Sequence, residues 1–112
     1  MNRAEKLHRL RRMAGMVLEL RAASLAKAAA EREAVRERLA ALNRVPDEAA
    51  MADMTEAQRF LVYEAWAAGR RTKLNQQLAR QEVIWRTELA AARQAFGRDQ
   101  VLVRLQEGRK RR

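Results

Sequence analysis

The chain has 112 residues, a single proline, four glycines, no cysteine and a net charge of +10. The lack of cysteine excludes a disulfide scaffold and a cysteine zinc site, and no stretch reaches the roughly 20 apolar residues of a membrane span. Aromatic residues make up only 4% of the chain, and strong helix formers dominate it, so the composition predicts long helices with a narrow apolar seam rather than a thick globular core.

The first predicted element is a helix from about residue 3 to about residue 43. Its apolar positions recur every three or four residues, which is the spacing of a coiled-coil seam with one four-residue stutter near Ala14. Arg21 and Arg32 fall within this seam, so their aliphatic stems must pack while their charged ends reach water. The predicted seam consists of Leu7, Leu10, Ala14, Leu18, Arg21, Leu25, Ala28, Arg32, Val35, Leu39 and Leu42.

A turn is predicted over residues 44–54. Pro46 disfavours helical geometry in the residue before it and therefore ends the first helix, and with the two acidic residues that follow it can open a short helical turn. Thr55 and Gln58 have the spacing of a capping box. Asp53 is an alternative N-cap, so the start of the next helix has two candidates.

The second predicted helix runs from about residue 55 to about residue 106, followed by a basic tail at 107–112. Gly97 falls inside its pattern, and Gly108 is expected just past its end. The predicted seam consists of Phe60, Tyr63, Ala67, Arg71, Leu74, Leu78, Gln81, Trp85, Leu89, Ala92, Phe96 and Val103.

Two long helices joined by about ten residues most naturally fold back on each other. We therefore predict an all-α fold, a single domain over residues 1–112 in which two long helices form an antiparallel coiled-coil hairpin. The alternative is a parallel dimer of one continuous rod, which would place Pro46 inside the rod. In the hairpin, residues 1–21 and 98–112 meet at one end with a charge of +4 each, whereas residues 44–68 carry −3, so the two ends differ in electrostatic potential.

The stretch 60–68 is apolar almost all round, although a hairpin needs only one apolar stripe. The surplus forms a second helical face and predicts a protein interface. The alternative is that the turn folds over this face through Val45, Met51 and Met54. The candidate interface residues are Leu61, Ala65, Trp66, Ala68 and Thr72.

Catalytic and metal-binding patterns are missing. His8 is the only histidine and the four glycines are isolated, so there is no triad and no phosphate-binding loop. Three glutamates at 31–37 alternate with arginines, as in surface ion pairs on a helix. No aromatic residues are interleaved with the terminal basic residues, which argues against a specific nucleic-acid partner. We expect a cytoplasmic protein without cofactors that is not an enzyme.

Segment 58–107 has an aromatic-rich start at 58–63, the Leu-Asn-Gln-Gln-Leu sequence at 74–78, and a basic end with leucines at 101–107. In these features it resembles the second helix of the FliJ family, small flagellar proteins of the type III export apparatus. The resemblance implies a coiled coil similar to the stalk subunit of rotary ATPases. It implies a position in the cytoplasm at the inner-membrane export apparatus.

As partners, the resemblance implies the hexameric export ATPase, the cytoplasmic domain of the export gate membrane protein, and export chaperones as a further candidate class. By position, the gate would contact Leu61, Ala65, Ala68 and Thr72 together with Trp66. The pore of the ATPase would contact the basic end, which comprises Arg9, Arg11, Arg12, Arg104, Arg109 and Lys110.

Three alternatives remain open at this point. A stalk of a related injectisome has the same features. A generic coiled-coil adaptor or chaperone would use only the apolar face, and a basic hairpin that binds nucleic acid would use only the charge.

Overall fold

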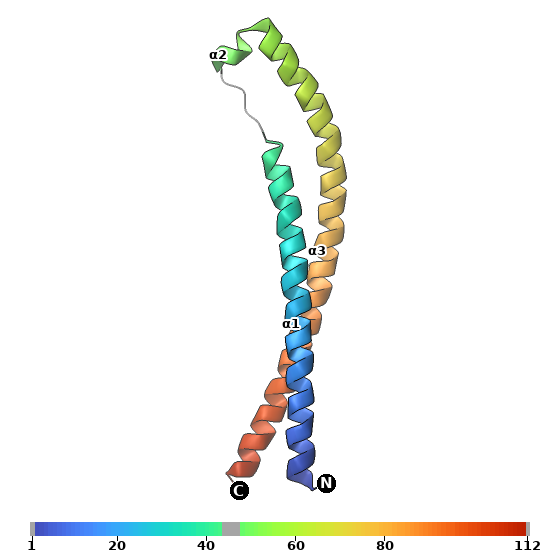
Figure 1. Cartoon of the computed structure of the whole chain (residues 1–112), viewed down its shortest axis with the longest axis vertical. Coiled ribbons are helices and arrows are strands. Elements are labelled where there is room, and N and C mark those ends of the chain that lie inside the picture. Colours follow the sequence, from blue (N-terminus) through green and yellow to red (C-terminus); the bar gives the residue numbers. More distant parts are fainter. Residues whose placement is uncertain (1, 44–47, 112) are drawn as a thin grey trace. The chain divides into compact units, whose positions relative to one another are not determined.

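The computed structural model describes residues 2–43 and 48–111. It contains two long helices, α1 (Arg3–Ala41) and α3 (Met54–Lys110), and one short helix between them, α2 (Glu48–Met51) (Figure 1). The described residues form no strands. The chain folds back between the long helices, which confirms the predicted all-α helical hairpin and contradicts the alternative of one continuous rod.

The hairpin divides into two compact units. Unit 1 pairs residues Met1–Ala30 with Val83–Arg112, and unit 2 comprises Glu31–Glu82. Within each unit, a segment of α1 lies against a segment of α3 that runs in the opposite direction. In unit 1, for example, Arg11 on α1 donates a hydrogen bond to the side-chain oxygen of Gln106 on α3 at 2.6 Å.

Side chains that accept backbone hydrogen bonds define where both long helices begin. The Asn2 side chain accepts a hydrogen bond from the Glu5 amide at 2.8 Å at the start of α1, and the Asp53 side chain accepts one from the Thr55 amide at 2.9 Å at the start of α3. Both are N-caps, which satisfy amides that have no partner inside the helix. Asp53, not Thr55, is therefore the cap of the second helix.

The helix ends differ slightly from the predicted bounds. Helix α1 ends at Ala41, two residues before the expected end, and α2 occupies part of the predicted turn. Helix α3 continues to Lys110 and includes both Gly97 and Gly108. Neither glycine has a positive φ, so Gly108 does not end the helix in the way that a left-handed C-cap would.

Most of the predicted α1 seam is at least partly buried. Two positions differ: Leu10 is 52% exposed, and Arg21 is also exposed. Arg11, the neighbour of Leu10, makes the bond across to Gln106. Arg11 is itself exposed, so it reaches across to α3 by its side chain and does not replace Leu10 as a buried seam residue.

The predicted α3 seam is wrong at one position. Phe96 is 55% exposed, whereas Ala95 is 5% exposed. The partly and fully buried positions continue regularly beyond Ala95 at Asp99, Leu102 and Gln106. The steps of three and four therefore persist along α3, and this backbone periodicity places an alanine in the seam and the larger phenylalanine outside it.

The buried residues are distributed unevenly. Unit 2 has a cluster formed by Val35, Leu42, Ala67 and Leu74, against which Leu39, Tyr63 and Leu78 pack. In unit 1, the buried hydrophobic residues of the described chain are three alanines, Ala28, Ala92 and Ala95. Alanine buries little apolar area, and the larger seam residues of unit 1, such as Leu18, Leu25 and Leu89, are only partly buried.

Ion pairs across the helices add to the packing of unit 2. The Glu82 carboxylate on α3 forms ion pairs with two arginines of α1, and its oxygen lies 3.4 Å from the Arg32 nitrogen and 3.1 Å from the Arg36 nitrogen. Arg36 also lies 3.9 Å from Glu33. The charges at 31–37 therefore contribute to interhelical pairing as well as to the surface pairs predicted within α1.

Candidate partner-binding surfaces

The first candidate surface is the α3 patch, which we define as Leu61, Ala65, Trp66, Ala68 and Thr72. All five residues are exposed; Leu61 is 65% exposed and Trp66 59%. The Thr72 hydroxyl donates to the Ala68 carbonyl at 3.1 Å, so its hydrogen-bonding group is satisfied within the helix. The patch therefore presents a mostly apolar face with an aromatic residue, as protein interfaces do.

The described part of the predicted turn does not cover the patch, since all five patch residues are exposed. Met54, one of the three residues expected to cover it, is itself 75% exposed. Val45 lies outside the described residues, as does the side chain of Met51. Trp66 instead packs against Tyr63 of the same helix, with ring centroids 5.8 Å apart and ring planes inclined by 44°.

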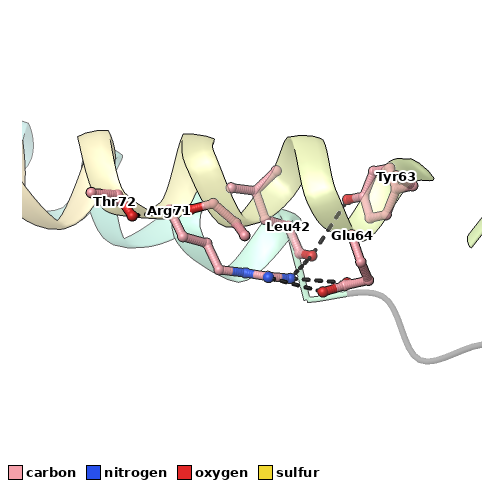
Figure 2. A network of polar contacts seen from close by, with 6 residues as sticks. Leu42, Tyr63, Glu64, Arg71 and Thr72 are labelled. Atoms are coloured by element: carbon pink, nitrogen blue, oxygen red, sulfur yellow. Dashed lines mark hydrogen bonds and ion pairs between the residues drawn. The ribbon is translucent and has the colours of Figure 1, made fainter. Parts of the chain in front are cut away.

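A polar cluster holds α3 against the end of α1 beside the α3 patch (Figure 2). The Arg71 guanidinium donates to the Leu42 carbonyl at 2.9 Å and to both carboxylate oxygens of Glu64 at 3.1 and 3.2 Å. The Tyr63 hydroxyl donates to the same Leu42 carbonyl at 3.4 Å. Carbonyls at the end of a helix have no partner within the helix. The bonds from Tyr63 and Arg71 give the Leu42 carbonyl its partners and thereby set the register between α1 and α3.

The paired charges in this cluster stabilise each other's ionised forms. The hydrogen bond from Arg71 lowers the pKa of Glu64 below its usual value, and the hydrogen bond to Glu64 raises the pKa of Arg71. Burial acts in the opposite direction on each group but is the smaller influence. Arg71 was predicted as a seam residue on periodicity alone, and the structure gives it this specific role as a bridge between the helices.

The second candidate surface is the basic end, which the structure places in unit 1. Arg9, Arg11 and Arg12 come from α1, and Arg104, Arg109 and Lys110 come from α3. All six residues are exposed. Arg104 and Arg109 line a hollow together with Arg3 and Lys6, so side chains from opposite ends of the sequence contribute to one positively charged surface.

The net charge of the protein lies entirely in unit 1. Residues 1–30 and 83–112 contain fifteen Lys and Arg against five Asp and Glu, whereas residues 31–82 contain nine of each. Unit 1 therefore carries +10 and unit 2 is neutral. Such a field increases the rate of encounter with acidic partners, and its effect falls with ionic strength.

A third surface was not predicted from the sequence. Unit 1 exposes large apolar residues from both helices, among them Leu10, Met13, Val17 and Val101. Three of them, Leu10, Met13 and Val17, follow one another at spacings of three and four residues on α1. A second heptad stripe beside the seam is the sequence signal that would have identified them.

The part of the chain that the structure describes has no group of three or more His, Cys, Asp or Glu side chains placed to hold a metal ion. Within the same residues, no helix combines the length and apolarity needed to cross a membrane. His8, the single histidine, is exposed on α1.

No protein-family model, curated protein or solved structure matches this chain.

Proposed function

We propose that this protein is a non-catalytic coiled-coil stalk of the flagellar type III protein export apparatus. In this role it binds the hexameric export ATPase and the cytoplasmic domain of the export gate. It works in the cytoplasm, at the inner-membrane export apparatus. The proposal extends the resemblance of residues 58–107 to the FliJ family.

The observation that carries the proposal is the separation of charge within a helical hairpin. Unit 1 has both chain ends and a net charge of +10, and unit 2 has no net charge. A strongly basic unit made of two paired helices suits docking into a ring pore lined by acidic side chains, because complementary charge accelerates and orients docking. The six exposed residues of the basic end supply these contacts.

The α3 patch supplies the second contact in this proposal. It lies on unit 2, so it is on the other unit from the basic end. Trp66 is the best candidate for an anchor residue, because tryptophans contribute more binding energy than most other side chains in protein interfaces. One molecule can then contact the ATPase and the gate through separate surfaces.

The proposal is tested by mixing the purified protein with its export ATPase and measuring ATP hydrolysis and hexamer formation. We expect the protein to increase both, and the charge reversals Arg9→Glu and Arg104→Glu to remove the increase. The matched control is reversal of Arg70 and Arg80, which are exposed arginines of unit 2. No change in hydrolysis or assembly on adding the wild-type protein would refute the ATPase part of the proposal.

Gate binding has its own test with the isolated cytoplasmic domain of the gate protein. Trp66→Ala should abolish capture of this domain, and Val83→Ala, at a residue that is 66% exposed on α3 outside the patch, should not. If the Trp66 variant loses partner capture while the charge reversals change nothing in either assay, the protein acts as an adaptor through its apolar face alone.

A further inference from the structure

Unit 1 has a second apolar stripe on α1, next to the seam, and a shorter one on α3. On α1 the stripe is formed by Leu10, Met13, Val17 and Leu20, all about half exposed or more, and it repeats with the heptad spacing of the seam itself. On α3 the corresponding positions, each immediately before a seam residue, are Gln94, Arg98, Val101 and Leu105. Val101 and Leu105 are the apolar ones, and both are 55% exposed.

The two stripes face each other across a groove. Leu10, Met13 and Val17 line it from α1, and Ala95, Val101 and Leu102 line it from α3, with a volume of about 570 Å³. The small residues Ala14 and Gly97 also line it between the larger side chains. The surface is therefore concave, so it fits the convex side of a helix better than the flat surface of a bilayer.

The groove continues into the hollow lined by Arg3, Lys6 and Arg109, because Leu10 lines both. Along α1 the combined surface extends from Arg3 to Val17. At a rise of about 1.5 Å per residue, this is about 20 Å, which corresponds to about two heptads of a docked helix.

The charge around the groove determines the kind of occupant. Five lining residues are basic, namely Arg3, Lys6, Arg98, Arg104 and Arg109, and none is acidic. Unit 1 of a second copy would bring another +10 to the same place, so like charges oppose that pairing. An acidic helix has the complementary charge.

The small core of unit 1 agrees with a missing layer. Its fully buried hydrophobic residues are alanines and its seam leucines are only partly buried, whereas the leucines, methionines and valines in the stripes remain exposed. A third helix in the groove would bury these larger side chains and supply the apolar burial that two helices leave unrealised.

We propose that this groove binds an acidic amphipathic α-helix of a partner protein, which completes unit 1 as a three-helix coiled coil. The groove shares Arg104 and Arg109 with the basic end of the proposed function. The inference rests on the apolar stripes, names neither the ATPase nor the gate, and applies to any partner with such a helix.

The test uses the full-length protein and a labelled synthetic peptide of about 21 residues, or three heptads, with leucine at the core positions and glutamate at the flanking positions. Repulsion between the glutamates keeps the free peptide monomeric at neutral pH. We expect saturable binding at one peptide per protein in fluorescence anisotropy, with an increase in helical circular dichroism. A matched peptide with lysine in place of glutamate should bind at least about tenfold more weakly.

Two groove variants, Val17→Asn and Val101→Asn, should each weaken binding of the glutamate peptide by at least about tenfold. Both residues are about half exposed, so the variants should keep the wild-type circular dichroism spectrum. The control is Leu61→Asn, the same kind of change on the α3 patch, which should leave the affinity unchanged.

Several results would overturn the proposal. These are a lack of saturable binding, equal affinity for the lysine peptide, and equal loss in the Leu61 variant. Sedimentation that shows self-association of the free protein, lost in Val17→Asn, would assign the groove to a second copy instead. Co-sedimentation with phosphatidylglycerol vesicles that depends on Val17, without peptide binding, would assign it to a membrane. The peptide assay contains neither the ATPase nor the gate, so failure of this proposal is measured separately from failure of the proposed function.

Discussion

Truncation of Leu74 to alanine tests whether the seam provides most of the stability of the hairpin. Leu74 is 2% exposed and belongs to the cluster with Val35, Leu42 and Ala67. Burying less apolar surface and leaving a cavity typically costs about 2–5 kcal/mol for a leucine-to-alanine change. A seam between only two helices can relax around the cavity, so we expect a loss of about 2–3 kcal/mol in the free energy of unfolding.

This loss converts into a measurable shift in melting temperature. The entropy of unfolding is about 2.1 cal/mol/K per residue, which for 112 residues gives about 0.24 kcal/mol/K. The expected decrease in Tm is therefore about 10 °C by circular dichroism at 222 nm. Leu61→Ala is the matched control, because it makes the same chemical change at a residue that is 65% exposed.

The control should change Tm by no more than about 2 °C, which corresponds to the usual limit of about 0.5 kcal/mol for surface substitutions. Equal shifts for the two variants would refute the assignment of Leu74 to the core and of Leu61 to the surface.

Three further predictions concern the polar cluster, the seam register and the charge of unit 1. In Arg71→Met, the pKa of Glu64 should rise towards its usual value in a carbon-detected NMR titration. Because the pKa of Glu64 is lowered in the wild-type protein, its pairing with Arg71 stabilises the folded state at pH values above the pKa of Glu64 in the unfolded chain. This contribution is lost as the pH falls through the lowered pKa of the folded state. An unchanged Glu64 pKa in the variant would contradict the pairing. Ala95→Asn should lower the unfolding free energy by about 1–3 kcal/mol because it buries an amide, and Phe96→Asn should lower it by less than about 1 kcal/mol. If urea denaturation showed a larger loss for Phe96→Asn than for Ala95→Asn, the predicted register with Phe96 in the seam would be correct. Both segments of unit 1, residues 1–30 and 83–112, are positively charged, so Tm should rise between about 20 mM and about 300 mM NaCl as salt screens the repulsion between them. A fall in Tm over this range would indicate that ion pairs dominate instead.

The fold could be predicted from the sequence because its main signals are local. The helix-forming composition, the break at Pro46 and the spacing of leucines act within a few residues of one another. The register at Phe96 could not be predicted in the same way. Hydrophobicity favours phenylalanine over alanine in a seam, but the alternating steps of three and four from Ala92 through Ala95 to Gln106 leave Ala95 as the residue in the buried position.

The sequence predicted the α3 patch but not the groove of unit 1, because again only local patterns could be recognised. The α3 patch was identified because nine consecutive residues at 60–68 are almost all apolar, and such a run exceeds what one seam requires. The groove of unit 1 was missed because its apolar residues are divided between two distant segments. Leu10 lies among arginines, and only the pairing of α1 with α3 places it beside Val101.

The contacts of Leu42 also bear on the order in which the hairpin forms. The bond from Tyr63 to the Leu42 carbonyl spans 21 residues of sequence, whereas the bond from Arg11 to Gln106 spans 95. Closing the longer loop from the unfolded chain costs roughly 1.3 kcal/mol more in entropy, since this cost grows with the logarithm of loop length. We therefore expect folding to begin near the turn and to proceed towards the chain ends, so that residues 1–30 and 83–112 pair last during folding and separate first during unfolding.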